Sequence, residues 1–445
     1  MRKQITKNKQ ESKLKDPYIS KKILIYCCFS FIGLINNLGY VLIITSSQQF
    51  ASKLNNDRLI AFYPLALIVF NFISRLINSK YCITISYFKR VLGLTIYFCF
   101  GYIFLFIVLT LIDNSENFNK QLAFFLTLIP AVIMGTGQSF GEATFLGYIR
   151  TFPEDYVSGW SSGTGFAGIF GATLSVIFKL IEESFQLKNL YLIISPITII
   201  FFFAFYYTHK LKKNIDDQIS LTNKMTMTEE TKVEENFNNN NKSLPERPID
   251  LFRDINIDNI ATDVSKNKEL SLKNCPIVFK YGKRYILNLA IVYFLEYTIC
   301  SGLCERANFF GHVNSKGYFY EKAQYETFLL FYQIGVVISR SSLFIFKYLT
   351  FIELLNIFQF INFIFWFFEA KIGIISNQWF CFITLIFLGL CGGGLYVGCF
   401  YFILNDNKIP PEYKELCLNI CTLFVDIGVL LSSLVCIVFD NTILK

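Results

Sequence analysis

FGEATFL at residues 140–146 and WSSGTGFAG at residues 160–168 are the two stretches that decide how this chain folds. The first places an acid, Glu142, inside an otherwise apolar run. The second belongs to a run with a small residue at every fourth position: Gly159, Gly163, Ala167 and Gly171. Residues at this spacing share one face of a helix, so a second helix can approach closely there. An acid inside a membrane span is typical of a substrate or ion pathway.

Two more glycines, Gly165 and Gly168, lie between the positions of this stripe. We assign all five glycines to helix packing: Gly159, Gly163, Gly165, Gly168 and Gly171. The hydroxyl groups of WSSGTG are open to two interpretations. They could bond a substrate, or they could bond the backbone one turn earlier or a neighbouring helix, as hydroxyls in membrane spans commonly do.

The composition places the chain among membrane proteins. Of its 445 residues, 53% are hydrophobic and 18% are aromatic, and the mean hydropathy is +0.44. A soluble domain does not need this much apolar surface, so we expect an all-α polytopic membrane protein. The net charge of +8 comes from tails and loops, where it orients the spans. It therefore indicates membrane lipid, and not nucleic acid, as a partner.

Residue types that carry catalysis or bind metals do not form useful arrangements. The 13 cysteines lie mostly in apolar runs and are expected to be small apolar filler. Both histidines lie outside these runs, and the spans hold no paired-histidine metal motif and no Ser-His constellation. We therefore expect no catalytic residue, no metal site and no cofactor, and a protein that is not an enzyme.

Eleven apolar runs have the length of a membrane span. They cover residues 23–47, 59–79, 91–112, 121–149, 156–181, 188–208, 285–304, 325–346, 350–370, 373–404 and 415–438. The segment between the sixth and seventh runs is rich in Asn, Lys, Asp and Glu. We expect a cytosolic tail over 1–22, a six-helix N-terminal half over 23–208, a disordered cytosolic linker over 209–284 and a five-helix C-terminal half over 285–445.

The positive charges predict which ends of the spans face the cytosol. Eight Lys and Arg residues lie in the N-terminal tail, and many more lie in the long linker. The loops on the opposite side hold few, namely Lys53 and Arg58 after the first span and Lys120 after the third. We therefore expect the N-terminus and the linker in the cytosol, and the C-terminus on the far side.

Two weak sequence matches indicate an internal repeat. The tripeptide ISR occurs at 73–75 and at 338–340, and a Pro-Glu pair follows a glycine-rich span at 153–154 and at 411–412. The matches keep the same order and nearly the same spacing. We expect two parallel repeats of six and five helices, with a fold like that of the major facilitator class. Transporters with parallel repeats bind their substrate between the halves, near the membrane midplane.

Seven stretches together resemble the battenin family of lysosomal membrane proteins, which is linked to Batten disease and has vacuolar relatives in fungi. They are NNLGYVLIITSS (36–47), FGEATFL (140–146), WSSGTGFAG (160–168), VYFLEYTICSGLCE (292–305), YQIGVVISRSSL (332–343), GLCGGGLYV (389–397) and DIG (426–428). The resemblance extends from the first apolar run to the last. It implies an endolysosomal or vacuolar polytopic protein with a fold similar to the major facilitator class. The roles proposed for the family are export of glycerophosphodiesters, transport of basic amino acids and balance of lysosomal pH.

Two carboxylates inside apolar runs are candidates for a substrate or proton pathway. Glu142 lies near the cytosolic end of the fourth span, and Glu296 lies in the middle of the seventh. Each could face a central cavity or pair with a neighbouring helix for packing. In the repeat, Glu296 matches Asn36 and Asn37 of the first span, and first spans of each half line the cavity in the facilitator class. Glu296 could exchange protons with an acidic lumen without the help of histidine.

Arg340, in the eighth span, offers a planar fork that suits a phosphate or a carboxylate. It could instead pair with Asp426 or Glu296 as a gating salt bridge. Gln333 lies about two turns earlier on roughly the same face. Asp426, in the last span, is assigned equally to function and to structural pairing. Arg75 is the repeat partner of Arg340, and we expect it to be an anchor at the membrane surface.

We therefore expect a secondary transporter in a lysosomal or vacuolar membrane that exports a small polar metabolite. The candidate substrates are a glycerophosphodiester and a basic amino acid such as arginine, with protons as a candidate coupling ion and a contribution to lysosomal pH homeostasis. The alternative is a lysosomal membrane protein that transports nothing and regulates trafficking or the proton pump. In that case the 209–284 linker would be its interaction arm, with protein partners that the sequence does not identify.

Overall fold

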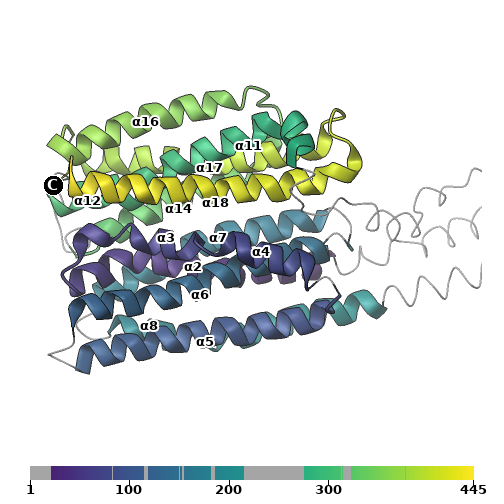
Figure 1. Ribbon diagram of the computed structural model, residues 1–445, viewed down its shortest axis with the longest axis horizontal. Helices are drawn as coiled ribbons and strands as arrows, with labels where there is room; N and C mark the ends of the chain where they lie inside the picture. Colours follow the sequence, from purple (N-terminus) through teal and green to yellow (C-terminus); the bar gives the residue numbers. More distant parts are fainter. Residues whose placement is uncertain are drawn as a thin grey trace, which may run out of the picture.

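The computed structural model describes residues 22–444, apart from 83, 115–118, 150, 153–154, 182–185, 215–274, 312, 314–321 and 376. Nearly all of the described residues are helical (Figure 1). Within the described part of the chain, ten helices are long and apolar enough to cross a membrane. The expectation of an all-α polytopic membrane protein is confirmed.

The N-terminal half, residues 22–214, contains α2 (Lys22–Lys53), η2 (Asp57–Leu59), α3 (Phe62–Ile68), α4 (Asn71–Lys80), α5 (Tyr87–Asn114), α6 (Lys120–Ile149), α7 (Asp155–Leu180) and α8 (Leu187–Ile194), which leads into a helix that ends at Asn214. The C-terminal half, residues 275–444, contains α11 (Cys275–Thr298), the π-helical turn η3 (Ile299–Leu303), α12 (Cys304–Phe309), α14 (Gln324–Ser341), α15 (Leu343–Phe346), α16 (Glu353–Ile372), α17 (Gln378–Asn405) and α18 (Pro411–Asn441).

One of the predicted runs, 325–346, forms a helix that differs from the ten apolar ones. α14 has 18 residues, and among them are Glu326, Gln333 and Arg340. It nevertheless lies inside the bundle, where it packs against α17 on one side and α7 on the other. Polar side chains are tolerated in a span that faces other helices and not lipid, so α14 marks the interior of the protein.

The bundle has two ends, which we name by the course of α2. The tail side is the end at which α2 begins, and the far side is the end at which α2 finishes and η2 lies. In Figure 1 the far side is on the left, where α18 ends and α12 lies. This direction fixes the depth of every other side chain, because the long helices run alternately up and down between the two ends.

The same pairs of helices pack in both halves. α2 packs on α7 as α11 packs on α18, and α4 packs on α6 as α14 packs on α17. Across the interface between the halves, α7 meets α14 and α3 meets α18. This repeated pairing is the expected result of two parallel repeats, and it brings the first and second helices of each half to the centre of the protein.

The boundaries predicted for the linker need correction. The helix that begins with α8 continues to Asn214, and α11 begins at Cys275, so both helices reach into the segment 209–284. The rest of the predicted linker, the tail up to residue 21 and the Pro-Glu pair at 153–154 lie outside the described residues. The helices are longer than the apolar runs because their tail-side turns are polar and extend beyond the hydrocarbon layer.

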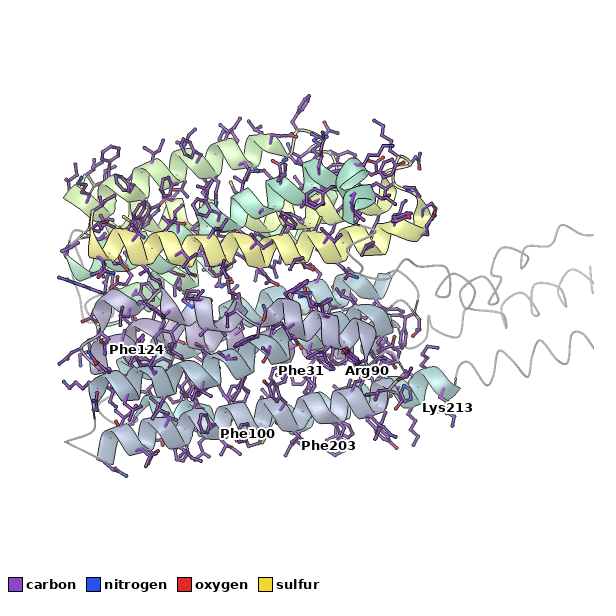
Figure 2. All side chains as sticks on the ribbon, viewed as in Figure 1. Phe31, Arg90, Phe100, Phe124, Phe203 and Lys213 are labelled. Atoms are coloured by element: carbon purple, nitrogen blue, oxygen red, sulfur yellow. The ribbon has the colours of Figure 1, made fainter. Side chains whose placement is uncertain are left out.

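Large apolar side chains cover the outer surface of the bundle. Phe100 on α5 is 54% exposed and Phe203 is 60% exposed, whereas Phe124 on α6 is buried (Figure 2). Exposed phenylalanine on this scale is unfavourable in water and favourable against lipid tails. The polar side chains of the spans therefore have to face the interior.

The glycine stripe of α7 faces α2. A Cβ atom at Gly163 would overlap the backbone carbonyl oxygen of Ser30, and Gly159 and Gly171 also meet α2 closely. The hydroxyl of Ser30 donates a hydrogen bond of 2.9 Å to the Gly159 carbonyl. Small residues at every fourth position thus let the two helices touch along their backbones.

Gly165 and Gly168 lie on a different face of α7, towards α14. A Cβ atom at Gly168 would overlap the side-chain oxygen of Gln333, and one at Gly165 would lie 3.6 Å from Val337. Three glycines of α7 therefore hold the N-terminal half together, and two lie at the contact between the halves.

We predict that Gly163→Ala lowers the free energy of unfolding by about 1–3 kcal/mol, because the added methyl group has to push α2 away from α7. Gly163→Leu should abolish function, since the larger side chain cannot fit at this contact. The measurement is thermal unfolding in detergent, followed by a transport assay. Gly93→Ala is the matched control, because nothing lies within 4 Å of a Cβ atom at Gly93. Equal stability of the Gly163→Ala and Gly93→Ala variants would contradict the packing assignment.

Candidate functional site

Arg75 forms the centre of a buried charge cluster that joins the two halves. It is only 8% exposed, and its Nη2 atom donates a hydrogen bond of 2.8 Å to Glu142 Oε2 on α6. Its Nε atom lies 3.6 Å from Asp426 Oδ2 on α18. Asn71 Nδ2 donates to the other oxygen of Asp426 at 3.3 Å. One guanidinium thus lies between a carboxylate of its own half and a carboxylate of the other half.

This geometry corrects two sequence interpretations. Arg75 is not an anchor at the membrane surface, because it is buried and ion-paired. The gating pair suggested between Arg340 and Asp426 is not formed, because Asp426 pairs with Arg75. Asp426 therefore has a partner that holds it in place, and Glu142 shares that partner.

Arg340, in contrast, has hydroxyl groups and a ring as its neighbours. Its Nη1 atom donates to Thr164 Oγ1 of α7 and its Nη2 atom donates to the Tyr293 hydroxyl of α11, both at 3.3 Å. The guanidinium lies 4.8 Å from the ring centroid of Tyr396 on α17, within cation–π range. Its Nε atom is buried and makes no hydrogen bond. No carboxylate among the described residues lies within ion-pair distance of Arg340.

The two arginines occupy equivalent places in the repeat but have different partners. Each contacts the fourth helix of its own half, Arg75 through Glu142 and Arg340 through Tyr396. Each also reaches across to the fifth helix of the other half, where Arg75 meets a carboxylate and Arg340 meets a hydroxyl. The first arginine is neutralised by contact and the second is not, so the second can accept an anion.

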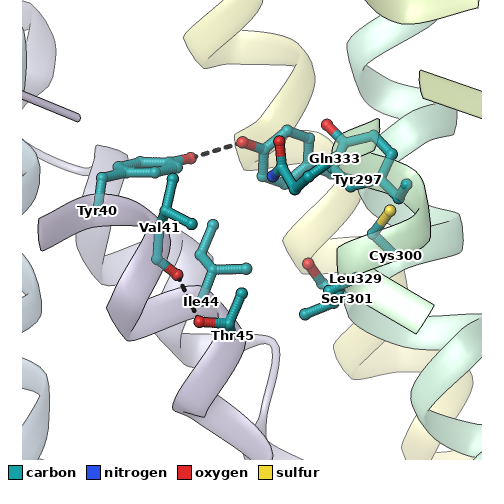
Figure 3. A pocket seen from close by; sticks show the side chains of 10 residues that line it. Tyr40, Val41, Ile44, Thr45, Tyr297, Cys300, Ser301, Leu329 and Gln333 are labelled. Atoms are coloured by element: carbon teal, nitrogen blue, oxygen red, sulfur yellow. Dashed lines mark hydrogen bonds between the residues drawn. The ribbon is translucent and has the colours of Figure 1, made fainter. Parts of the chain in front are cut away.

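Tyrosines connect these two clusters. Tyr396 lies within electrostatic range of Glu142 and Arg75 as well as of Arg340. The rings of Tyr293 and Tyr297 stack with their centroids 6.3 Å apart. The hydroxyl of Tyr297 lies 2.9 Å from that of Tyr40, so this hydrogen bond joins α11 to α2 across the halves (Figure 3).

Glu296 is buried on the C-terminal side of this centre. It is 2% exposed, and its Oε1 atom accepts a hydrogen bond from the hydroxyl of Tyr332. The other oxygen, Oε2, lies against Gly392 and makes no hydrogen bond. Arg340 lies within electrostatic range of Glu296 but outside contact distance. The suggested pair between these two residues is therefore not formed.

The remaining candidates lie around the same centre. Asn36 Nδ2 donates to the Gln138 carbonyl at 3.1 Å, and Gln138 Nε2 donates to Asn37 Oδ1 at 3.0 Å, so both asparagines face α6. Gln333 lines a small cavity that Tyr40 and Tyr297 also line (Figure 3). The predicted site residues are thus spread along the bundle axis, since Gln333 and Arg340 lie about two turns apart on α14. The asparagines meet α6 and not Glu296.

Two further polar clusters lie towards the far side. Gln49 Nε2 of α2 donates to Glu326 Oε1 of α14 at 2.7 Å. The side chain of Arg306 is only 1% exposed. Its Nε atom lies 2.7 Å from Asp440 Oδ1 and 3.4 Å from Glu305 Oε2. η2 of the N-terminal half packs against α18 beside them. Among the described residues, the Gln49–Glu326 bond therefore joins the halves near the far side, in addition to the bonds made by Arg340 and by Tyr40.

Several of these residues carry no distinguishing signal in the sequence. Tyr293, Tyr297 and Tyr396 were not separable from the other tyrosines, because the chain has 25 of them. Glu305 and Arg306 were missed because they follow the seventh span, where charge is ordinary. Within the described part of the chain, no three His, Cys, Asp or Glu side chains come together in a way that could hold a metal ion.

Comparisons with known proteins agree with this architecture. The model of the CLN3 protein family matches residues 27–445. Battenin of Dictyostelium discoideum is 28% identical over 430 residues, which cover 94% of each chain. Among solved structures, an auto-inhibited POT family peptide transporter has a TM-score of 0.56 at 10% identity, over 94% of this chain and 89% of that chain.

A bacterial homolog of the human lysosomal transporter Spinster, in an inward-facing and unoccupied conformation, has a TM-score of 0.51 at 12% identity. The match covers 94% of this chain and 82% of that chain. At these identities the likeness concerns the fold, which is that of major-facilitator-like membrane transporters. The battenin resemblance of the sequence motifs is confirmed by the family match.

We predict that Arg75→Ala lowers the free energy of unfolding by about 3–5 kcal/mol, because it leaves Glu142 and Asp426 buried without a counter-charge. Adding Glu142→Gln and Asp426→Asn to the same chain should recover most of that loss, since both carboxylates are then neutral. The measurement is thermal or denaturant unfolding in detergent.

The matched control is Arg284→Ala, which breaks a pair with Glu353 in which both side chains are 47% exposed. An exposed pair of this kind contributes less than about 1 kcal/mol. An Arg75→Ala variant as stable as Arg284→Ala would show that the central cluster does not hold the halves together.

Proposed function

This chain belongs to the CLN3 protein family, and we propose that it is a secondary transporter that exports a small anionic metabolite, a glycerophosphodiester, from an acidic organelle. The fold is that of membrane transporters with a binding site between two halves. The charges at the centre of the bundle, in particular that of Arg340, favour an anionic substrate.

The observation that carries the proposal is the unequal pairing of the two repeat-related arginines. Arg75 is neutralised by Glu142 and Asp426, whereas Arg340 contacts only hydroxyl groups and an aromatic ring. A half-buried arginine without a contacting counter-charge attracts an anion, and its planar fork suits two oxygens of a phosphodiester. Thr164 and Tyr293 would then act as additional donors to the phosphate.

Arg340 is also well placed to couple binding to movement. It lies on α14 and bonds Thr164 of α7, so its site spans the contact between the halves. An anion held by groups from both halves stabilises the arrangement in which they approach each other. Alternating access needs such a difference in affinity between the two arrangements.

Protons are proposed as the coupling ion, with Glu296 as their carrier. Glu296 is buried, lies within electrostatic range of Arg340 and has one oxygen without a hydrogen bond. A substrate anion at Arg340 weakens the attraction between Arg340 and the ionised carboxylate. The anion therefore favours the protonated form of Glu296, and substrate and proton are expected to bind together.

Arginine is a second candidate substrate, which the same geometry supports in a different way. Its α-carboxylate could bind Arg340 while its guanidinium binds Glu296. We further propose that the tail side faces the cytosol and that the membrane is lysosomal or vacuolar, where the far side meets an acidic lumen. Export of an anion with a proton would contribute to lysosomal pH homeostasis.

We predict that Arg340→Ala reduces uptake of glycerophosphocholine into proteoliposomes on the order of 10²-fold, because a buried charge-assisted contact to the anion is lost. Uptake is measured for labelled glycerophosphocholine and for labelled arginine, with an acidic or a neutral vesicle lumen. Arg284→Ala, which removes an exposed arginine, should leave uptake unchanged. Saturable wild-type flux that persists in Arg340→Ala would remove Arg340 from the site.

The alternative function, regulation of trafficking or of the proton pump without transport, makes a different prediction. Deleting residues 215–270 should leave uptake of glycerophosphocholine at the wild-type level, since the proposed site lies within the helices. If folded wild-type protein moves neither substrate, and the deletion abolishes its cellular function, the regulatory alternative replaces the transporter proposal.

A further inference from the structure

A small cavity lies between α2, η3 and α14, on the far side of the Tyr40–Tyr297 hydrogen bond (Figure 3). Its volume is about 30 Å³, which is room for about two water molecules and too little for a metabolite. It is distinct from the Arg340 site, because Arg340, Thr164 and Tyr293 do not line it. The cavity therefore needs an explanation other than substrate binding.

Polar groups inside the cavity point to water. Ser301 lines it and is 3% exposed, yet its Oγ atom has no hydrogen-bond partner. A buried hydroxyl without a partner is costly, and internal water is the usual remedy. Tyr332 and Gln333, which carry a hydroxyl and an amide, are also among the lining residues. Two to four polar partners are what a buried water molecule requires.

The π-helical turn η3 explains why Ser301 reaches this position. η3 covers Ile299–Leu303, directly after the helix that carries Glu296. A π-turn holds one more residue than an α-turn, so it rotates the following side chains relative to the preceding ones, and such turns are frequent at functional sites. Here the turn places Ser301 beside α2 and α14.

The cavity is connected to Glu296 by one hydroxyl group. Tyr332 lines the cavity, and its hydroxyl donates a hydrogen bond to Glu296 Oε1. Thr45 of α2 also lines the cavity. One turn further along α2, Gln49 donates a hydrogen bond to Glu326. Gln49 also lines a second cavity, with Lys53, Asp113 and Lys188, at the far-side end of the bundle. Polar groups thus continue from that end to Glu296.

We propose that this cavity is a hydrated proton relay from the far side to Glu296, with Tyr332 as the positioning residue that passes the proton. A cavity water that has received a proton from the far side donates one proton to the Tyr332 oxygen. Tyr332 at the same time releases its own hydroxyl proton to Glu296 Oε1. Tyr332 is neutral before and after the step, the water returns to its neutral form, and Glu296 gains one proton.

The inference rests on the proposed role of Glu296 as proton carrier, and it adds the route and its side. The titratable and charged groups around Glu296 come from three helices besides α11: Tyr332 and Arg340 of α14, Cys391 of α17 and Tyr40 of α2. On α11 and η3 themselves, the neighbours are Tyr293, Tyr297 and Cys300. Arg340 is the one cation among these groups, and it does not touch Glu296, so contact from the cavity side is through Tyr332.

The test uses infrared spectroscopy of the full chain in liposomes and needs no transport substrate. After a rapid drop in pH, the C=O stretch of a newly protonated buried carboxyl group is followed in time, and Glu296→Gln assigns the band. We expect Tyr332→Phe to slow the rise of this band on the order of 10²-fold, because the positioned proton donor is lost. An unchanged rate in Tyr332→Phe would overturn the relay.

Tyr325→Phe is the matched control. Tyr325 is a buried tyrosine of the same helix whose hydroxyl donates to the Cys300 carbonyl at 3.3 Å, and it does not line the cavity. In the Tyr325→Phe variant, Glu296 should be protonated at the wild-type rate. Ser301→Leu fills the cavity and leaves the Tyr332–Glu296 hydrogen bond in place. It should slow the rise of the Glu296 band, as Tyr332→Phe does. A wild-type rate in Ser301→Leu, or no Glu296 band in the wild type, would also overturn the relay.

The outcome is separable from that of the proposed function. Protein that moves glycerophosphocholine with an acidic lumen, but protonates Glu296 equally fast in Tyr332→Phe, retains the transporter proposal and loses the relay. If the Glu296 band rises more slowly in Tyr332→Phe but the wild-type protein moves no substrate, the relay is supported and the substrate assignment is contradicted.

Discussion

The buried contact of Arg75 with Glu142 and Asp426 is the constraint on which the arrangement of the halves depends. Three helices from two halves contribute to it: α4, α6 and α18. Two carboxylates and one guanidinium out of water are tolerated only while they stay together. The contact therefore fixes how α4 and α18 are rotated about their axes, so that Asn71 of α4 also meets Asp426 of α18.

Apart from this ion-paired contact, the described hydrogen bonds between the halves each join one pair of side chains. Tyr40 meets Tyr297 through hydroxyl groups, and Arg340 meets Thr164. A bond between two hydroxyl groups contributes about 1 kcal/mol, and one to a charged group such as Arg340 contributes about 1.5–3 kcal/mol. Each of these single bonds can be exchanged for a bond to water or to a ligand. The interface thus combines one ion-paired contact, at Arg75, with single hydrogen bonds that can open. Gln49 and Glu326 form another such bond near the far side.

Much of the fold was predictable from the sequence, whereas the pairing within the site was not. Apolar runs and the stripe at Gly159, Gly163 and Gly171 are local patterns, so they indicate spans and close contacts directly. Charges inside apolar runs are rare, which is why Glu142, Glu296, Arg340 and Asp426 stood out. Their partners depend on how helices rotate against each other. The break between α3 and α4 carries Arg75 into the interior, and the tripeptide ISR alone does not reveal that break.

The polarity of α14 has a consequence for how the chain enters the membrane. α14 carries Glu326 in its first turn and Arg340 in its last turn. A charged residue opposes entry of a lone helix into lipid by about 2.5–3.5 kcal/mol at the helix centre and by less towards the helix ends. α7 is already in place when α14 is synthesised, but α17, which covers its other face, is made later. α14 is therefore covered on one face by a helix made before it and on the other by a helix made after it, and it reaches its full burial only once α17 is in place.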